Sequence, residues 1–257
     1  MRIERIGGAT LYLGDCRESM PTLGDACAIV SDPPYGMAFD TDSTRYTRPS
    51  RSGRHMGNRA ASFRPKRADR QIPGDDRPFD PAPWLRRESI LWGANHYHQR
   101  LPKGTTLVWL KRSPQHYGTF LSDAEVGWQA GGCGVYVFYA EDSSGRRILE
   151  AGGQIGTGDP TAHPTQKPIA LMQWCVGRVR APVICDPYMG SGTTGVACAR
   201  MGRQFVGVEI DPQYFDIACR RIEEAYRQRD MFVDAPVAED PSDARTADLF
   251  AEPEFGA

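Results

Sequence analysis

Long apolar runs are missing from this chain of 257 residues. No stretch approaches the roughly 20 consecutive apolar residues that a membrane-spanning helix needs, and the opening Met-Arg-Ile-Glu-Arg lacks the apolar segment of a signal peptide. Hydrophobic residues make up 40% of the chain, a normal globular balance. We therefore expect a soluble, cytoplasmic protein with one large α/β domain that carries an insertion, because the length does not suffice for two full domains with linkers.

Paired cysteine ligands are also missing. The seven cysteines contain no Cys-x-x-Cys pair, and most lie in apolar stretches that are typical of small buried thiols. His96 and His98 form the only close histidine pair, and no cysteine lies near them. We predict free thiols and no metal site.

Acidic residues are scarce in one stretch and concentrated in another. Residues 231–257 hold seven acids and one base, which leaves 30 bases and 25 acids in residues 1–230. Residues 43–70 hold one acid, Asp69, and nine bases. These bases are Arg45, Arg48, Arg51, Arg54, Arg59, Arg64, Lys66, Arg67 and Arg70. Such a density suits a polyanionic partner such as nucleic acid, although a solvated loop whose arginines serve solubility explains the composition equally well.

Short β-rich runs and helical patterns divide the chain. We predict strands at 10–13, 26–31, 89–92, 105–110, 135–139, 182–185 and 204–209, and helices at 168–176, 193–200 and 212–227. Residues from about 37 to 83 lack apolar periodicity, which indicates a long loop or insertion. We expect one domain over residues 1–230, followed by an acidic, disordered tail over 231–257.

A glycine-rich segment joins the last two predicted strands through a helix. Residues 186–195 contain a G-x-G-x-x-G spacing, and the next strand ends at Glu209, where a carboxylate can accept hydrogen bonds from ribose hydroxyls. NAD satisfies the same pattern. Asp186 favours S-adenosylmethionine, because a carboxylate here repels a pyrophosphate and attracts the ammonium of a methionine moiety; alternatively, Asp186 is only a turn or cap residue.

A second motif, Asp32-Pro33-Pro34-Tyr35, follows an apolar strand. An exocyclic base amine is a poor nucleophile because its lone pair is delocalised into the ring. The Asp32 carboxylate and the Pro33 carbonyl can accept hydrogen bonds from the two N–H groups of this amine, and Tyr35 can stack on a base rotated out of the duplex. A rigid turn at the end of a strand, with a packed tyrosine, is the structural alternative.

These motifs together resemble the β group of DNA amino-methyltransferases, in which the target-base motif precedes the cofactor motif. The resemblance covers about residues 9–228 and depends most on Asp32 to Tyr35, His163 to Pro168, and residues 186–194 followed by 205–211. It implies an α/β fold with a Rossmann-like methyltransferase sheet that is mostly parallel and flanked by helices. The motifs of this fold follow one another along the chain in a permuted order. The resemblance also implies S-adenosylmethionine as cofactor and double-stranded DNA as partner; a homodimer is left open.

Residue roles follow from the same resemblance. Asp32, Pro33, Pro34 and Tyr35 are the implied catalytic residues. Asp15 would meet the adenine end of the cofactor, residues 163–167 its methionine side, and Glu209 its ribose. The full implied cofactor set is Asp15, Cys16, Asp32, His163, Thr165, Gln166, Lys167, Asp186, Pro187, Tyr188, Gly190, Ser191, Gly192, Thr193, Thr194, Glu209, Ile210 and Asp211.

One interval departs from the family pattern. The family often has a sizeable recognition region between the segment at 120–128 and the His163 motif, and here that interval is short. We therefore hypothesise that the nine bases of residues 43–70 contact the DNA phosphates.

Several functions remain open from the sequence. Asp32 favours adenine N6 over cytosine N4, because the Ser-Pro-Pro-Tyr variant of the family is associated with cytosine N4. The absence of a Pro-Cys dipeptide argues against cytosine-C5 chemistry. Methylation of protein or RNA, a catalytically inactive DNA-binding module and an NAD-dependent oxidoreductase are the remaining alternatives.

Overall fold

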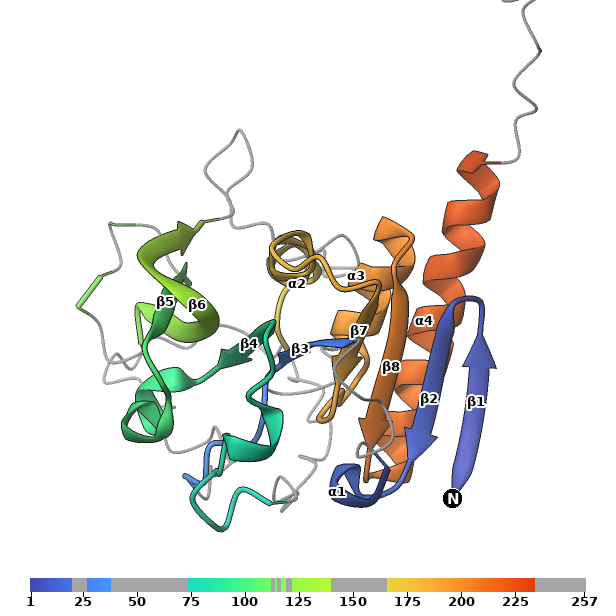
Figure 1. The fold of residues 1–257 in the computed structure, drawn as a ribbon. Helices are drawn as coiled ribbons and strands as arrows, with labels where there is room; N and C mark the ends of the chain where they lie inside the picture. The colour runs from blue at the N-terminus through green and yellow to red at the C-terminus, as the bar shows by residue number, and fades with distance from the viewer. Residues whose placement is uncertain are drawn as a thin grey trace, which may run out of the picture.

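Eight strands form one mixed sheet in the computed structural model, which describes residues 1–19, 27–37, 74–111, 114, 117–118, 122–139 and 166–233. The strand order is β1-β2-β8-β7-β3-β4-β6-β5 (Figure 1). The strands are β1 (Arg2–Ile6), β2 (Ala9–Leu13), β3 (Cys27–Ser31), β4 (Ser89–Trp92), β5 (Gly104–Leu110), β6 (Ala124–Phe138), β7 (Val183–Asp186) and β8 (Gln204–Glu209).

The centre of the sheet is parallel and its edges are antiparallel. Strands β2, β8, β7, β3 and β4 pair in parallel, whereas β1, β6 and β5 pair antiparallel to their neighbours. All five residues of β3 are buried, as expected for a parallel strand covered on both faces. The predicted fold class, a mostly parallel α/β sheet flanked by helices, is confirmed.

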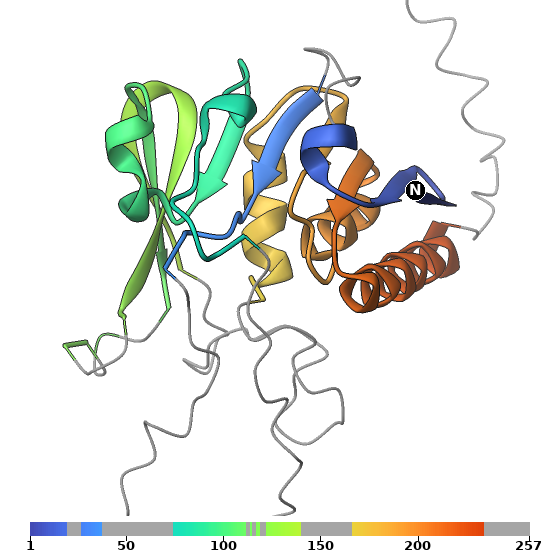
Figure 2. The same cartoon turned by 90° about the horizontal axis from the view of Figure 1, so that it is seen from below.

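The helices divide between the two faces of the sheet. α2 (Ile169–Gly177), α3 (Thr193–Met201) and α4 (Pro212–Val233) pack side by side on one face, and α1 (Cys16–Ser19) lies on the other (Figure 2). Side chains of β3 alternate accordingly, since Ala28 and Val30 join the core under α2 to α4, while Cys27 and Ile29 join a second core with Phe79 and Trp84. Both faces of the central strands are therefore buried.

The C-terminal helix is longer than predicted. α4 reaches Val233, and so continues three residues into the segment assigned to the acidic tail; residues 234–257 lie outside the described residues. Within the part of the chain that the structure describes, no helix is both long and apolar enough to cross a bilayer.

Two strands differ from the sequence prediction. β1 was not predicted, and only the last part of β6 was expected as a strand. Gly131 and Gly132 have φ angles of +78° and +67°, a backbone conformation that residues other than glycine rarely adopt. The chain turns there, and β6 continues along β5 a second time, so that Thr106 faces both Trp128 and Val135.

A buried carboxylate joins β3, β7 and α3. Asp186 ends β7 and is 3% exposed; it accepts hydrogen bonds from the Ser31 hydroxyl at 2.6 Å, the Thr194 hydroxyl at 2.6 Å and the Tyr188 backbone N–H at 3.1 Å. Burial raises the pKa of Asp186 to about 6, and these three donors act in the opposite direction. The ends of two central strands are thus tied together by one side chain.

Replacing this carboxylate should destabilise the fold. We expect Asp186→Ala to lower the free energy of unfolding by about 2–4 kcal/mol, because it leaves buried hydroxyl and amide donors without their acceptor. Asp216→Ala is the control, since Asp216 forms an exposed ion pair with Arg2 at 2.7 Å, a type of contact typically contributing about 0–1 kcal/mol. Urea denaturation of both variants measures the difference; equal losses would contradict the assigned role.

Candidate active site

The predicted target-base motif is a rigid turn at the carboxyl end of β3. Gly36, at a φ of +77°, and Met37 donate their backbone N–H groups to Asp75 Oδ1 at 2.7 Å and 3.1 Å. Asp75 is itself 4% exposed. With two prolines restricting the turn from within and Asp75 anchoring its end, Asp32 and Tyr35 project from a fixed backbone.

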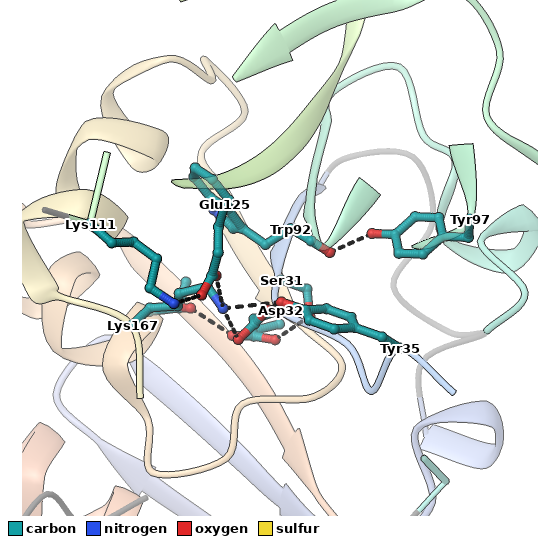
Figure 3. Close-up of polar contacts among 10 residues, drawn as sticks. Ser31, Asp32, Tyr35, Trp92, Tyr97, Lys111, Glu125 and Lys167 are labelled. Carbon is teal, nitrogen blue, oxygen red and sulfur yellow. Dashed lines mark hydrogen bonds and ion pairs between the residues drawn. The ribbon is translucent and has the colours of Figure 1, made fainter. Parts of the chain in front are cut away.

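Both carboxylate oxygens of Asp32 have partners within the protein (Figure 3). The Tyr35 hydroxyl donates to Oδ1 at 2.5 Å, and Lys167 Nζ donates to Oδ2 at 2.5 Å. The Asp32 side chain is 23% exposed, so it retains access to solvent. These two contacts, to opposite oxygens, hold the carboxylate plane in one orientation.

The ammonium of Lys167 belongs to a larger cluster of charges. Its Nζ also lies 3.0 Å from Glu125 Oε2, and Lys111 Nζ lies 2.6 Å from Glu125 Oε1 (Figure 3). Burial acts to lower the pKa of Lys167, but the negative charge of Asp32 and further acidic neighbours raise it well above its ordinary value. Burial likewise acts to raise the pKa of Glu125, and the charges of Lys167 and Lys111 lower it. Lys167 and Glu125 are therefore both charged at neutral pH.

The ring of Tyr35 lies against the loop that follows β4. His96 stacks on it with ring centroids 4.9 Å apart and 12° between the planes. Gly93, at a φ of +76°, approaches so closely that a Cβ would lie 2.0 Å from Tyr35 Cε1. The Tyr97 hydroxyl donates to the Trp92 carbonyl at 2.5 Å and closes this loop (Figure 3).

The glycine-rich segment forms a tight loop between β7 and α3. Gly190 has a φ of +52°, and no atom lies within 4 Å of the position that a Cβ would take there. At Gly192, by contrast, a Cβ would lie 2.8 Å from the Cβ of Ala218 in α4. One glycine thus leaves open space beside the loop, and the other permits close packing of helices.

Glu209 and Asp15 lie at the ends of two adjacent strands. Leu13 pairs with Glu209 across β2 and β8, and Gly14 donates its N–H to the Glu209 carbonyl at 2.9 Å. The Glu209 carboxylate accepts backbone hydrogen bonds from Gly190 at 2.9 Å and Asp211 at 2.8 Å. Burial raises the pKa of Glu209 to about 7, and these two amides moderate the rise.

Several residues of the predicted cofactor set have structural partners. Arg221 Nη1 of α4 donates to the Ser191 carbonyl at 2.6 Å and its hydroxyl at 2.8 Å, and lies 3.3 Å from the Thr193 hydroxyl. Asp211 accepts the N–H of Gln213 at the start of α4 at 2.7 Å. The Thr194 hydroxyl donates a hydrogen bond to Asp186, as a turn or cap role predicts, and the predicted contact of Asp186 with an ammonium stays a prediction.

Other predicted positions are distributed around the same edge of the sheet. Cys16 is 7% exposed, and burial raises its pKa to about 11, whereas Ile210 is 52% exposed. Tyr188 packs edge-on against Phe79 and Trp84. His163, Thr165 and the nine bases of residues 43–70 lie outside the described residues, so their roles stay predictions.

Residues 166 and 167 lie between the two predicted halves of the site. Gln166 Oε1 accepts from the Ser191 hydroxyl at 3.3 Å, which supports its place beside the glycine loop. The ammonium of Lys167 contacts Asp32 and Glu125, and its predicted role beside the cofactor stays a prediction. Sequence reasoning could not see this pairing, since 135 positions separate Lys167 from Asp32.

The sequence analysis also missed Glu125, Lys111, His96 and Asp75 as site residues. Two of these left a detectable signal. Lys111 directly follows the apolar run 105–110, and Glu125 precedes Val126 in another β-rich stretch. A charge adjoining a buried strand often has a partner, but the sequence does not say which.

Comparison with known proteins identifies the family. A family model described as DNA methylase matches residues 86–220, which is more than half of the chain. The chain belongs to this family.

Individual relatives match the chain over shorter stretches. The Type II methyltransferase M2.DpnII of Streptococcus pneumoniae is 43% identical over 63 residues, and M2.LlaDCHI of Lactococcus lactis subsp. cremoris is 40% identical over 62 residues. These alignments span 24% and 23% of the two relatives, and the same shares of this chain.

Two solved structures align with more of the chain. The M1.HpyAVI-SAM complex aligns over 83% of this chain and 98% of its own, with 20% identity and a TM-score of 0.45. The PvuII DNA methyltransferase (cytosine-N4-specific) aligns over 87% and 93%, with 14% identity and a TM-score of 0.48.

The contact between Gly93 and the Tyr35 ring generates a stability prediction. We expect Gly93→Ala to destabilise the protein by about 1–3 kcal/mol more than Gly131→Ala, because overpacking adds to the backbone penalty. Gly131 is the matched control: its φ is +78°, and nothing lies within 4 Å of its Cβ position. Chemical denaturation compares the two variants. Equal destabilisation would mean that the Tyr35 ring moves aside freely.

Proposed function

We propose that this DNA methylase transfers a methyl group from S-adenosylmethionine to the exocyclic amine of a DNA base, with adenine N6 as the target. The observation that carries the proposal is the 2.6 Å hydrogen bond between Ser31 and Asp186. It joins the end of the strand before Asp32 to the start of the glycine loop. The two predicted motifs therefore share one edge of the sheet, as transfer between two ligands requires.

The chemistry of Asp32 fits an amine acceptor. A carboxylate offers about four lone-pair directions, and Tyr35 and Lys167 use one on each oxygen. The remaining lone pairs can accept an N–H of the target amine, with the Pro33 carbonyl as the second acceptor. Hydrogen bonds to these two acceptors pull the N–H groups out of the plane of the base. The nitrogen lone pair is then localised, which makes the amine nucleophilic.

The Tyr35 ring suits a base that has been rotated out of the duplex. His96 already lies parallel to it, so this ring accepts a planar aromatic partner in the present conformation. Burial raises the pKa of Tyr35 well above its ordinary value, which keeps the hydroxyl protonated and able to donate to Asp32. A base stacked here would have its amine near that carboxylate.

The opposite side of the site fits S-adenosylmethionine. The open space beside Gly190 admits a ligand, and the buried carboxylate of Glu209 is available to ribose hydroxyls. Asp15, Gln166, Gly190 and Glu209 are the described residues that would hold the cofactor. When bound, this cofactor supplies an electrophilic methyl group on a sulfonium.

Adenine is proposed as the base because Asp32 stands where the family's variant associated with cytosine N4 has serine. Cytosine N4 is the second candidate, since it presents the same amine to the same acceptors. Double-stranded DNA is the proposed partner, and the nine Arg and Lys residues of segment 43–70 are its hypothesised phosphate contacts.

Removing the carboxylate of Asp32 should abolish transfer. We expect Asp32→Ala to reduce methylation of DNA by at least about a hundredfold, the scale of losing one electrostatic acceptor of a transition state. The assay incubates protein, genomic DNA and isotope-labelled S-adenosylmethionine, digests the DNA to nucleosides and identifies the methylated nucleoside by mass. Labelled N6-methyl-2′-deoxyadenosine is expected, and N4-methyl-2′-deoxycytidine would select the second candidate.

The control for this variant is cofactor binding measured by calorimetry. Asp32→Ala should keep its affinity for S-adenosylmethionine within a fewfold of the unchanged protein. Full transfer activity in the variant, or tighter binding of NAD than of S-adenosylmethionine by the unchanged protein, would contradict the proposal.

Cofactor affinity should fall in mildly acidic solution. Only the ionised form of Glu209 accepts hydrogen bonds from both ribose hydroxyls, and its pKa of about 7 means that it is half protonated at neutrality and mostly protonated at pH 6. We expect affinity to drop by about tenfold between pH 8 and pH 6, as the ionised fraction does. Glu209→Gln should bind weakly with a flatter profile; an identical pH profile in both proteins would exclude Glu209 as the cause.

A further inference from the structure

The ammonium of Lys167 contacts three groups of the target side and is almost fully enclosed. Its side chain is 5% exposed. Asp32 Oδ2, Glu125 Oε2 and the Tyr35 hydroxyl oxygen lie 2.5, 3.0 and 3.1 Å from Nζ. Nζ donates hydrogen bonds to Asp32 Oδ2 and to the Tyr35 hydroxyl oxygen, and its contact with Glu125 Oε2 is an ion pair.

The charges of this cluster balance. Lys167 lies between two carboxylates, and Lys111 on the outer oxygen of Glu125 supplies the second positive charge (Figure 3). A buried ammonium is tolerated only when its desolvation is offset by partners with good geometry. Glu125 therefore keeps Lys167 charged without drawing it away from Asp32.

We propose that Lys167 is a positioning residue for methyl transfer: it fixes the Asp32 carboxylate in the orientation that the target amine requires, and it does not bind the cofactor. This inference rests on the proposed function. A free aspartate carboxylate rotates broadly about its last torsion. Contacts to Lys167 on Oδ2 and Tyr35 on Oδ1 remove that freedom before the base arrives.

The position of Lys167 along the chain adds a mechanical link. Gln166, its neighbour, contacts Ser191 of the glycine loop at 3.3 Å, while Lys167 contacts Asp32. Two consecutive residues thus touch the cofactor side and the target side. Pro168 follows and precedes the buried helix α2, whose Ile169, Leu171 and Met172 anchor this segment in the core.

Substitution of the lysine separates positioning from cofactor binding. We expect Lys167→Met, which preserves length and volume, to lower the single-turnover methylation rate by about a hundredfold while the Kd for S-adenosylmethionine changes less than threefold. Lys167→Arg keeps the charge and should recover about tenfold of the lost rate. Lys103→Met is the control, because it removes the positive charge of an exposed lysine outside the cluster, and its rate should stay within about threefold of the unchanged protein.

A double variant tests whether the lysine acts through Asp32. If it does, adding Lys167→Met to Asp32→Asn should reduce the residual rate by less than threefold, since the group being positioned has already been altered. A purely structural role would give multiplicative losses and no rescue by arginine. Circular dichroism and thermal unfolding verify that each variant is folded. If Lys167→Met is not folded, the rate of Lys167→Arg is compared with that of the unchanged protein instead.

Two results would overturn the inference. One is a Lys167→Met rate within threefold of the unchanged protein. The other is a parallel loss of S-adenosylmethionine binding, which would return Lys167 to the cofactor side. Failure of the unchanged protein to methylate any base would instead refute the proposed function itself, so the two failures are distinguishable.

Discussion

The parallel pairing of β3 with β7 is the constraint on which the site depends. Parallel neighbours end at the same edge of a sheet, so the turn after Ser31 and the loop after Asp186 emerge together. The hydrogen bond between these two residues reinforces a proximity that the backbone ladder already dictates. Because β3 and β7 are buried on both faces, neither strand end can move without disturbing the core.

Much of this arrangement could be predicted from local sequence. The strands at 89–92 and 204–209 were predicted with their observed bounds, and the helix predicted at 193–200 extends by one residue. Local signals sufficed because apolar runs bounded by Gly, Pro and Asp mark such elements clearly. β1 was missed because Arg2, Glu4 and Arg5 give it little apolar character, and it forms by pairing with β2.

The charged cluster could not be predicted in the same way. Asp32, Glu125 and Lys167 come from three distant segments, and a sequence does not state which carboxylate will neutralise which ammonium. Local patterns predicted correctly that the Asp32 turn and the glycine loop exist. Which partners hold the functional groups depends on the assembled sheet, where β6 brings Glu125 beside the segment that precedes α2.

The short contact between Tyr35 and Asp32 has a consequence for selectivity. The phenolic hydroxyl already occupies one oxygen of the carboxylate, so an incoming base gains only if it offers a donor that can replace or complement it. Under the proposed function, a base edge with acceptors alone would place its lone pairs against those of Asp32, whereas an amino group could donate to them. The resting site would then favour amino edges over carbonyl edges before any bond is made.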